Sequence, residues 1–292
     1  MAATERSNYR CWHRLRVRWA EVDMQKVVFN AHYLMYVDTA VTEYWRALAL
    51  PYEAALQQLG GDIFVKKATV EYHASARFDD LLNIGMRCAR VGNSSMLFEA
   101  AIFCGDTLIV TAELVYVYTS ATSPVPQPVP AALRAVFDAF EAGQAMMQLQ
   151  VGNWESLQMQ TSSLRQAVFV QEQGIGAHLV WDDADAGAVH ALVCNRLGQP
   201  VAVGRMVQSE PGVGRIGRMA VSRALRGSHL GQEVVWALVG AAKERGDHEI
   251  MLHAQCSAQG FYGRLGFQPR GPVFEEVGIA HIEMVQALVS KA

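Results

Sequence analysis

Two glycines and two arginines are spaced in a way that suits the binding of an anion. Arg223, Arg226, Gly227 and Gly231 lie between a short Met-Ala-Val strand and an amphipathic helical run at residues 232–245. The glycines keep side chains out of the turn, so the first N–H groups of the helix and its partial positive charge can face an anion. The arginines add charge at the same place. This stretch therefore predicts a pyrophosphate cradle.

The residues around the cradle resemble a known enzyme family. The order Arg-Gly-x-x-x-Gly at residues 226–231 is similar to the coenzyme A pyrophosphate loop of the GNAT N-acetyltransferases. The segment 260–267, Gly-Phe-Tyr-Gly-Arg-Leu-Gly-Phe, is similar to the second signature of that family, which implies that Tyr262 protonates the departing CoA thiolate. His229 departs from the family, which usually has glycine there. The residues that the resemblance assigns to coenzyme A are Met219, Ala220, Val221, Arg226, Gly227, Ser228, His229, Leu230 and Gly231.

The general base and the acceptor of this second half stay open in the sequence. Candidates for the base are Glu172, His190 and His253, and a proton can also leave an amine through water. Glu275, Glu276 and His281 could attract a cationic amine, or they could form a solvated acidic turn. The pattern at residues 164–173 resembles a GNAT subgroup and, more faintly, acyl-homoserine lactone synthases. We expect no metal site, because Asp182, Asp183 and Asp185 lack the glycine and terminal glutamate of a calcium loop.

A loop in the first half resembles a second family. Residues 21–34, Glu-Val-Asp-Met-Gln-Lys-Val-Val-Phe-Asn-Ala-His-Tyr-Leu, are similar to the signature of the 4-hydroxybenzoyl-CoA/acyl-CoA thioesterase branch of the hot-dog fold. The resemblance covers residues 11–119 and implies that Asp23 is the nucleophile or general base. This chain departs from many members of that branch at Asn30, where they have histidine, and at Gln25 and Lys26, where they have glycines.

The chemistry of a thioester agrees with this assignment. A carboxylate can attack the carbonyl or activate water, and a helix N-terminus can stabilise the oxyanion. Asp23 precedes Asn30 by seven residues, Asn30 is a good N-cap, and Ala31 and His32 would lie near the carbonyl. Asp23 could instead only order its own loop, and His32 could be solvated.

The hydrophobic periodicity predicts the elements of each half, and the two resemblances imply a different fold for each. The first is an α+β hot-dog domain, an antiparallel sheet around a central helix at residues 31–50; its strands are expected at residues 11–19, 63–77, 81–91, 95–104 and 107–119. The second is an α/β GNAT domain, a mixed sheet flanked by helices. The predicted boundaries are a thioesterase-like domain at 1–119, a Pro-rich linker with a short helix at 120–146, and an acetyltransferase domain at 147–292.

Charge and composition exclude several partners. The net charge is −3 and the pI is about 6.3, which gives no reason to expect nucleic-acid binding. The five cysteines are dispersed without CxxC spacing, and no segment approaches a membrane span or a signal core, so we expect a cytoplasmic protein.

Taken together, the two halves predict a bifunctional acyl-CoA enzyme without a permanently bound cofactor. The first half would hydrolyse a pantetheine thioester, carried by CoA or an acyl carrier protein, and the second would transfer its acyl group to an unknown amine. Hot-dog domains usually complete their sites between subunits, which implies a homo-oligomer through residues 11–119. The alternative is that one half is an acyl-CoA sensor that regulates the other.

Overall fold

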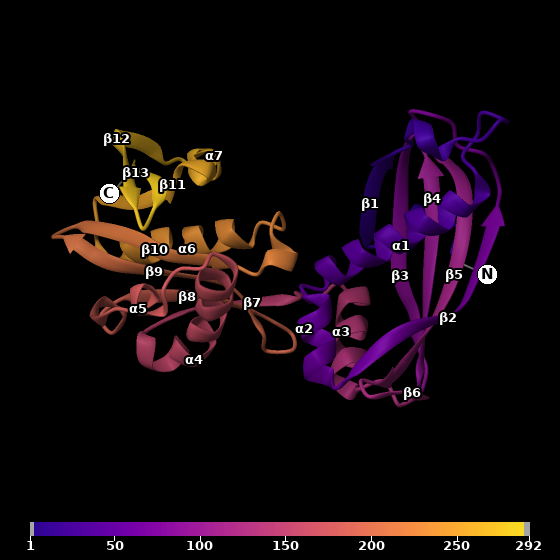
Figure 1. Cartoon of the computed structure of the whole chain (residues 1–292), viewed down its shortest axis with the longest axis horizontal. Helices are drawn as coiled ribbons and strands as arrows, with labels where there is room; N and C mark the ends of the chain where they lie inside the picture. Colours follow the sequence, from indigo (N-terminus) through magenta and orange to yellow (C-terminus); the bar gives the residue numbers. More distant parts are fainter. Residues whose placement is uncertain (1–2, 289–292) are drawn as a thin grey trace. The chain divides into compact units, whose positions relative to one another are not determined.

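The computed structural model describes residues 3–288, and the chain divides into two compact units, Met1–Met146 and Met147–Ala292 (Figure 1). Each unit contains its own sheet and its own buried core. Within the described residues, no helix combines the length and the apolar character that crossing a membrane requires.

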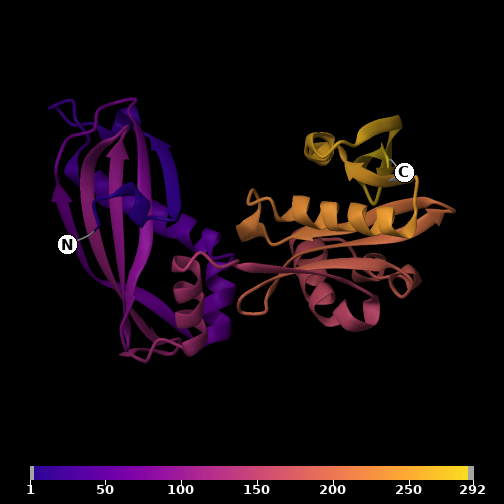
Figure 2. The same cartoon turned by 180° about the vertical axis from the view of Figure 1, so that it is seen from behind.

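The first unit is an antiparallel sheet packed against one long helix, as Figures 1 and 2 show. Helix α1 (Asn30–Ala47) packs on β1, β3 and β5 through apolar residues that recur at helical spacing, among them Tyr33, Val37, Tyr44 and Trp45. The predicted α+β hot-dog fold is confirmed. The strands of the sheet, in spatial order, are β1 (Cys11–Arg16), β3 (Leu81–Val91), β4 (Ser95–Cys104), β5 (Thr107–Ser120) and β2 (Gly61–Tyr72), with the short β6 (Ser123–Pro126) also pairing with β5.

A second helix in this unit, α2 (Tyr52–Leu59), was not predicted. Helix α1 ends at Ala47, before the predicted end at residue 50, and Pro51 is the N-cap of a new helix that buries Ala55 and Leu56. Gly60 then ends α2 with φ of 75°, a left-handed conformation that glycine adopts without a steric penalty.

The segment expected to be a linker, residues 120–146, packs into the first unit. Helix α3 (Ala131–Glu141) buries Phe137, whose ring lies 6.2 Å from that of Tyr44 and 5.7 Å from that of Phe98. The Tyr44 hydroxyl donates to Glu141 Oε1 at 2.6 Å. The prolines predict extended backbone, which β6 provides, but they carry no information about the apolar face of the following helix.

We expect Phe137→Ala to lower the free energy of unfolding of the first unit by about 3–5 kcal/mol, because a fully buried ring is replaced by a cavity. Urea denaturation of the full chain, combined with hydrogen exchange of the β3–β5 amides, measures the loss. Ala135→Gln on the exposed side of the same helix is the control and is expected to change stability by less than about 0.5 kcal/mol. Equal effects of the two substitutions would show that α3 is not part of this core.

The second unit is a seven-stranded mixed sheet with helices on both faces. Figures 1 and 2 show α6 (Leu230–Arg245) on one side and α4 (Trp154–Arg165) on the other. Only the β10–β11 pair is parallel. The predicted mixed sheet flanked by helices is confirmed. In spatial order the strands are β12 (Gln268–Glu276), β13 (Ile279–Ala287), β11 (Glu249–Gln255), β10 (Val213–Val221), β9 (Pro200–Glu210), β8 (Val189–Asn195) and β7 (Met147–Gly152).

Two elements of this unit were not anticipated from the sequence. Helix α4 ends at Arg165, and the chain continues as a π-helical segment, η3 (Gln166–Glu172). Strand β12 was not predicted, and the acidic pair Glu275 and Glu276 lies at its end rather than in an isolated turn. The remaining helices are the short α5 (Ala177–Val180) and α7 (Gln259–Arg264).

Candidate active sites

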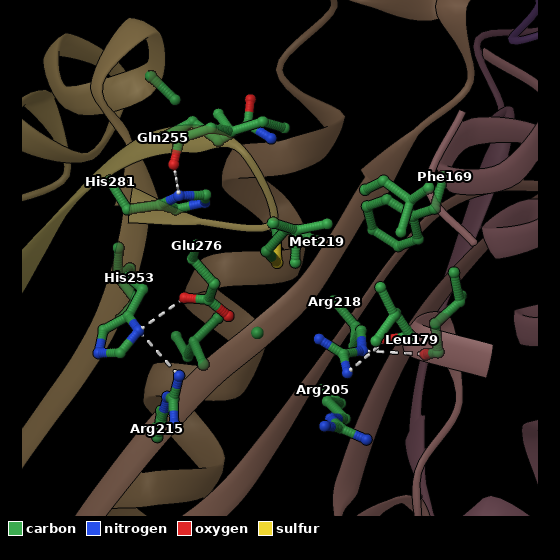
Figure 3. A pocket seen from close by; sticks show the side chains of 18 of the residues that line it. Phe169, Leu179, Arg205, Arg215, Arg218, Met219, His253, Gln255, Glu276 and His281 are labelled. Carbon is green, nitrogen blue, oxygen red and sulfur yellow. Dashed lines mark hydrogen bonds and ion pairs between the residues drawn. The ribbon is translucent and has the colours of Figure 1, made fainter. Parts of the chain in front are cut away.

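A cavity of about 470 Å³ opens in the second unit where two parallel strands separate. Strands β10 and β11 pair only from Val213 with Glu249 to Ile216 with Leu252. Beyond this point β10 bulges away from its register with β9, and Arg218 adopts φ of 52°. Residues of β9, β10, β11, α7 and the β12–β13 hairpin line the space, and Figure 3 shows part of the lining.

Tyr262 lines this cavity from α7. Its side chain is almost buried, at 8% exposed, and packs against Phe261 and Phe267. Burial raises the pKa of Tyr262 to about 12. The phenol therefore keeps its proton at neutral pH, which is the state that a general acid requires.

The predicted pyrophosphate cradle lies at the start of α6. The backbone N–H groups of Gly227, His229, Leu230 and Gly231 have no backbone acceptor among residues 3–288. His229 is the N-cap and adopts φ of 64°, a left-handed conformation in which glycine would be unstrained. His229 therefore adopts here the backbone conformation that favours glycine. Four free donors at the positive end of a 16-residue helix suit an anion.

Two side chains of the cradle, those of Arg226 and Ser228, form hydrogen bonds within the protein. Arg226 donates from Nη1 and Nη2 to the two carboxylate oxygens of Glu172, at 2.6 and 2.7 Å, and Ser228 Oγ donates to the Leu225 carbonyl. The hydrogen bond from Arg226 is the main cause that lowers the pKa of Glu172. A phosphate that binds Arg226 must compete with this carboxylate, and Glu172 is poorly suited to act as a base.

The structure separates the two histidine candidates for the base. His190 is fully buried, and its Nε2 contacts the Asp185 carbonyl at 2.9 Å. Burial is the largest cause that lowers the pKa of His190. His253 lines the cavity instead, together with Glu276 and His281.

The Nδ1 atom of His253 lies between two competing partners. Arg215 Nη2 is 2.9 Å from it and Glu276 Oε2 is 3.0 Å from it, and Figure 3 draws both contacts as dashed lines that meet at this atom. A ring nitrogen carries either a hydrogen or a lone pair, so it can accept from Arg215 or donate to Glu276 but not both. Burial favours a higher pKa for Glu276. The hydrogen bond from His253, together with the charges of His253, His281 and Arg215, lowers the pKa overall. The carboxylate is therefore ionised at neutral pH and can accept the Nδ1 hydrogen.

Two of the three aspartates that were considered for a metal loop bind arginines. Asp185 is buried and contacts Arg165 Nη1 at 2.9 Å and Arg205 Nη1 at 2.7 Å. Asp182 contacts Arg205 at 2.6 Å and Arg218 at 2.9 Å. This chain of ion pairs connects the core of the unit to the cavity wall. No cluster of three potential metal ligands occurs among residues 3–288.

We expect Asp185→Asn to lower the free energy of unfolding of the second unit by about 3–5 kcal/mol, because it leaves buried Arg165 without a counter-charge. Burial opposes ionisation of Asp185, but hydrogen bonds and charges of Arg205 and Arg165 lower its pKa overall. The ionised carboxylate therefore stabilises the folded unit fully above the ordinary pKa of about 3.9, and this stabilisation is lost as the pH falls through the lower pKa of the folded state. Urea denaturation at pH 7 and at pH 3 measures both effects. Exposed Asp183→Asn in the same turn is the control, and a comparable loss there would contradict this account.

In the first unit a small hairpin brings Asp23 towards the start of α1. A bridge between Val22 and Val28 closes the hairpin, and Asp23 pairs with Val27 through its backbone N–H at 2.9 Å. Asp23 Oδ1 accepts from the Gln25 N–H at 2.7 Å, so this carboxylate does order its own loop, while Oδ2 has no partner among residues 3–288. Lys26 adopts φ of 63°, again the conformation of a glycine that many relatives have.

The start of α1 corrects one expectation. Phe29 is the N-cap, no side chain caps the helix, and Asn30 is the first helical residue instead of the cap. The N–H groups of Asn30 and Ala31 have no acceptor among residues 3–288 and are available to a substrate oxygen. His32 lies in the same turn with its Nδ1 buried and without a hydrogen-bond partner.

Comparisons with known proteins match each unit to one family. A model of the thioesterase-like superfamily matches residues 17–137, and a model of the GNAT acetyltransferase domain matches residues 177–288. The protein "Protein ElaA" of Escherichia coli K12 is 35% identical over 131 residues, which are 43% of this chain and 84% of ElaA. The acyl-CoA thioester hydrolase YbgC of Escherichia coli O6:H1 is 30% identical over 124 residues, which are 42% of this chain and 92% of YbgC. The chain belongs to both families.

The predicted fusion, thioesterase-like first and GNAT second, is therefore confirmed. Among solved structures, E. coli ElaA is similar with a TM-score of 0.44 and 31% identity, covering 48% of this chain and 99% of ElaA. A thioesterase from Thermus thermophilus, complexed with coenzyme A and Zn, is similar with a TM-score of 0.41 and 24% identity, covering 46% of this chain and 96% of that chain.

The sequence did not reveal three polar residues of the GNAT cavity. Arg205, Arg215 and Arg218 line it from β9 and β10, two strands that otherwise look like ordinary apolar strands. A signal was present, because a basic residue inside an apolar strand has to meet a counter-charge or a ligand.

Proposed function

We propose that the chain is a bifunctional acyl-CoA enzyme, in which the GNAT domain transfers an acyl group to an amine and the thioesterase-like domain hydrolyses an acyl thioester. The observation that carries the proposal is the protonated, buried Tyr262 at a cavity formed where β10 leaves β11.

In the GNAT domain the open edge of β10 would hold the pantetheine arm. Met219, Ala220 and Val221 have no pairing with β11, so their backbone groups on that side can bond to the amides of the arm. The pyrophosphate would bind at the N–H groups of residues 227–231. The amine attacks the thioester carbonyl, the C–S bond breaks, and the thiolate takes the proton of Tyr262.

The thioesterase-like domain would use Asp23 on the same kind of donor. Its free carboxylate oxygen can attack the thioester or activate water, and the N–H groups of Asn30 and Ala31 can bind the oxyanion. The similarity to a protein named as an acyl-CoA thioester hydrolase supports CoA as the carrier.

We expect thiol release from acyl-CoAs in the absence of amine to fall about 100-fold or more in Asp23→Asn, because an amide is neither a nucleophile nor a base. Amine-dependent thiol release should fall by a similar factor in Tyr262→Phe and stay unchanged in Asp23→Asn. A panel of short, long and aromatic acyl-CoAs, assayed by thiol detection, measures both. Asp106→Asn, on an exposed hairpin turn of the same domain, is the matched control.

The outcomes separate the proposed roles. Hydrolysis that survives Asp23→Asn would remove Asp23 from the mechanism. If no thioester is hydrolysed by the native chain, the thioesterase-like domain is better described as an acyl-CoA sensor, and transfer by the GNAT domain is the sole activity.

The edge of the hot-dog sheet supports a homo-oligomer. Strand β2 pairs with β5 on one side and has no strand partner on the other among residues 3–288. It is 12 residues long and exposes Phe64 and Val65, at 55% and 49%. A long apolar edge is a template for pairing with another strand, so we propose that β2 pairs with a second copy of this domain.

We expect the double substitution Phe64→Asp and Val65→Asp to convert this oligomer to a monomer, because opposed carboxylates would meet at the edge. Sedimentation velocity measures the mass. Val277→Asp, at a residue of the GNAT domain that is 54% exposed, is the control and should leave the mass unchanged. A native chain that sediments as a monomer at micromolar concentration would contradict the proposal.

A further inference from the structure

Charged side chains line the GNAT cavity. Three arginines, Arg205, Arg215 and Arg218, lie in its wall together with two carboxylates, Asp182 and Glu276. Arg205 and Arg218 share Asp182, and Arg205 also pairs with buried Asp185 at 2.7 Å. Arg205 and Arg218 therefore have their counter-charges within the protein.

Among the described residues, Arg215 is the cavity arginine that forms no direct ion pair, although its charge helps to lower the pKa of Glu276. It makes no ion pair within 4.0 Å among residues 3–288, and its one side-chain partner there is Nδ1 of His253. Ionised Glu276 competes for the same atom and needs the hydrogen on it. Whenever His253 donates to Glu276, the Arg215 guanidinium is left without a partner inside the cavity wall. A guanidinium placed in this way is suited to bind a carboxylate through two parallel hydrogen bonds.

We propose that the acceptor is an amino-carboxylic acid, whose carboxylate binds Arg215 and whose ammonium group binds Glu276. The inference rests on the proposed transferase function of the same cavity. In Figure 3 the dashed lines from Arg215 and Glu276 meet at the same nitrogen of His253, and Phe169 and Leu179 lie across the cavity as an apolar wall for the rest of the acceptor. The limited volume, which also has to hold the acyl thioester, favours a small acceptor.

Binding of the substrate carboxylate to Arg215 also frees His253 to act as the base. When the substrate carboxylate takes Arg215, His253 donates Nδ1–H to Glu276, and the lone pair of Nε2 becomes free. The ammonium proton passes to Nε2 through water. The amine nitrogen then forms the bond to the acyl carbon and releases its second proton to solvent water. The C–S bond breaks, Tyr262 gives its proton to the thiolate, and exchange with solvent restores both side chains. Binding of the correct acceptor is thereby coupled to its deprotonation.

The test compares substrates with and without the carboxylate in two variants. Amine-dependent thiol release from acetyl-CoA is measured with L-leucine, L-methionine and L-glutamate, with the α-carboxamide of each, and with putrescine. We expect the native chain to favour the acids over their carboxamides by at least about 100-fold in kcat/KM, because a carboxamide leaves Arg215 unpaired. In Arg215→Gln this preference should fall to about 1-fold to 5-fold, while Lys243→Gln, which removes an exposed charge away from the cavity, should keep it.

The results that would overturn the proposal are distinct from failure of the transferase. A native preference for carboxamides or putrescine, or a preference for acids that survives Arg215→Gln, contradicts it. If no amine supports thiol release, the transferase function fails, and calorimetric titration of the same acids and carboxamides decides the binding inference by itself. Acid binding that requires Arg215 would support the carboxylate site, and absence of binding would refute it. Circular dichroism and the melting temperature of Arg215→Gln verify that the variant is folded.

Discussion

The separation of β10 from β11 is the constraint on which the GNAT site depends. Four residue pairs hold the strands together, and the bulge of β10 then turns the next residues out of register. Arg218 is the pivot, with a left-handed conformation that costs roughly 1–3 kcal/mol for a non-glycine residue. Its guanidinium offsets this cost with bonds to the Leu179 and Val180 carbonyls and to Asp182. The cavity exists because these bonds are formed.

The ion pairs that continue from Arg218 connect the cavity wall to the core of the unit. Asp182 and Asp185 alternate with arginines at the end of α4, in β9 and in β10, and the inner pair is buried. Buried ion pairs are a poor source of net stability compared with apolar packing, but breaking one is costly. Their effect here is to fix where Arg205 and Arg218 lie, which leaves Arg215 as the guanidinium able to turn towards a substrate.

The sequence predicted well those elements that local residue order determines. Strands β3 and β4 begin and end as expected, because Asn93-Ser94 and Gly105-Asp106 place hairpin turns between apolar runs. The packing of α3 and the existence of β12 were missed, because both depend on partners distant in the sequence. The Arg215–His253–Glu276 cluster was missed for the same reason, since it assembles from β10, β11 and β12. His253 and Glu276 were each noticed, but only the fold shows that they share one hydrogen-bonding atom.

The departures from family pattern have a physical meaning that the sequence alone does not show. Six non-glycine residues among the described ones have positive φ, and four of them, Lys26, Arg218, His229 and Val277, lie in the Asp23 hairpin, in the cradle or on the cavity wall. Lys26 and His229 stand where relatives usually have glycine, yet both adopt the left-handed conformation that glycine would adopt, at a cost of roughly 1–2 kcal/mol each. Both loops thus adopt the left-handed conformation without a glycine, and the N–H groups at the start of α6 have no backbone acceptor among residues 3–288. Each position also carries a side chain that a glycine would lack.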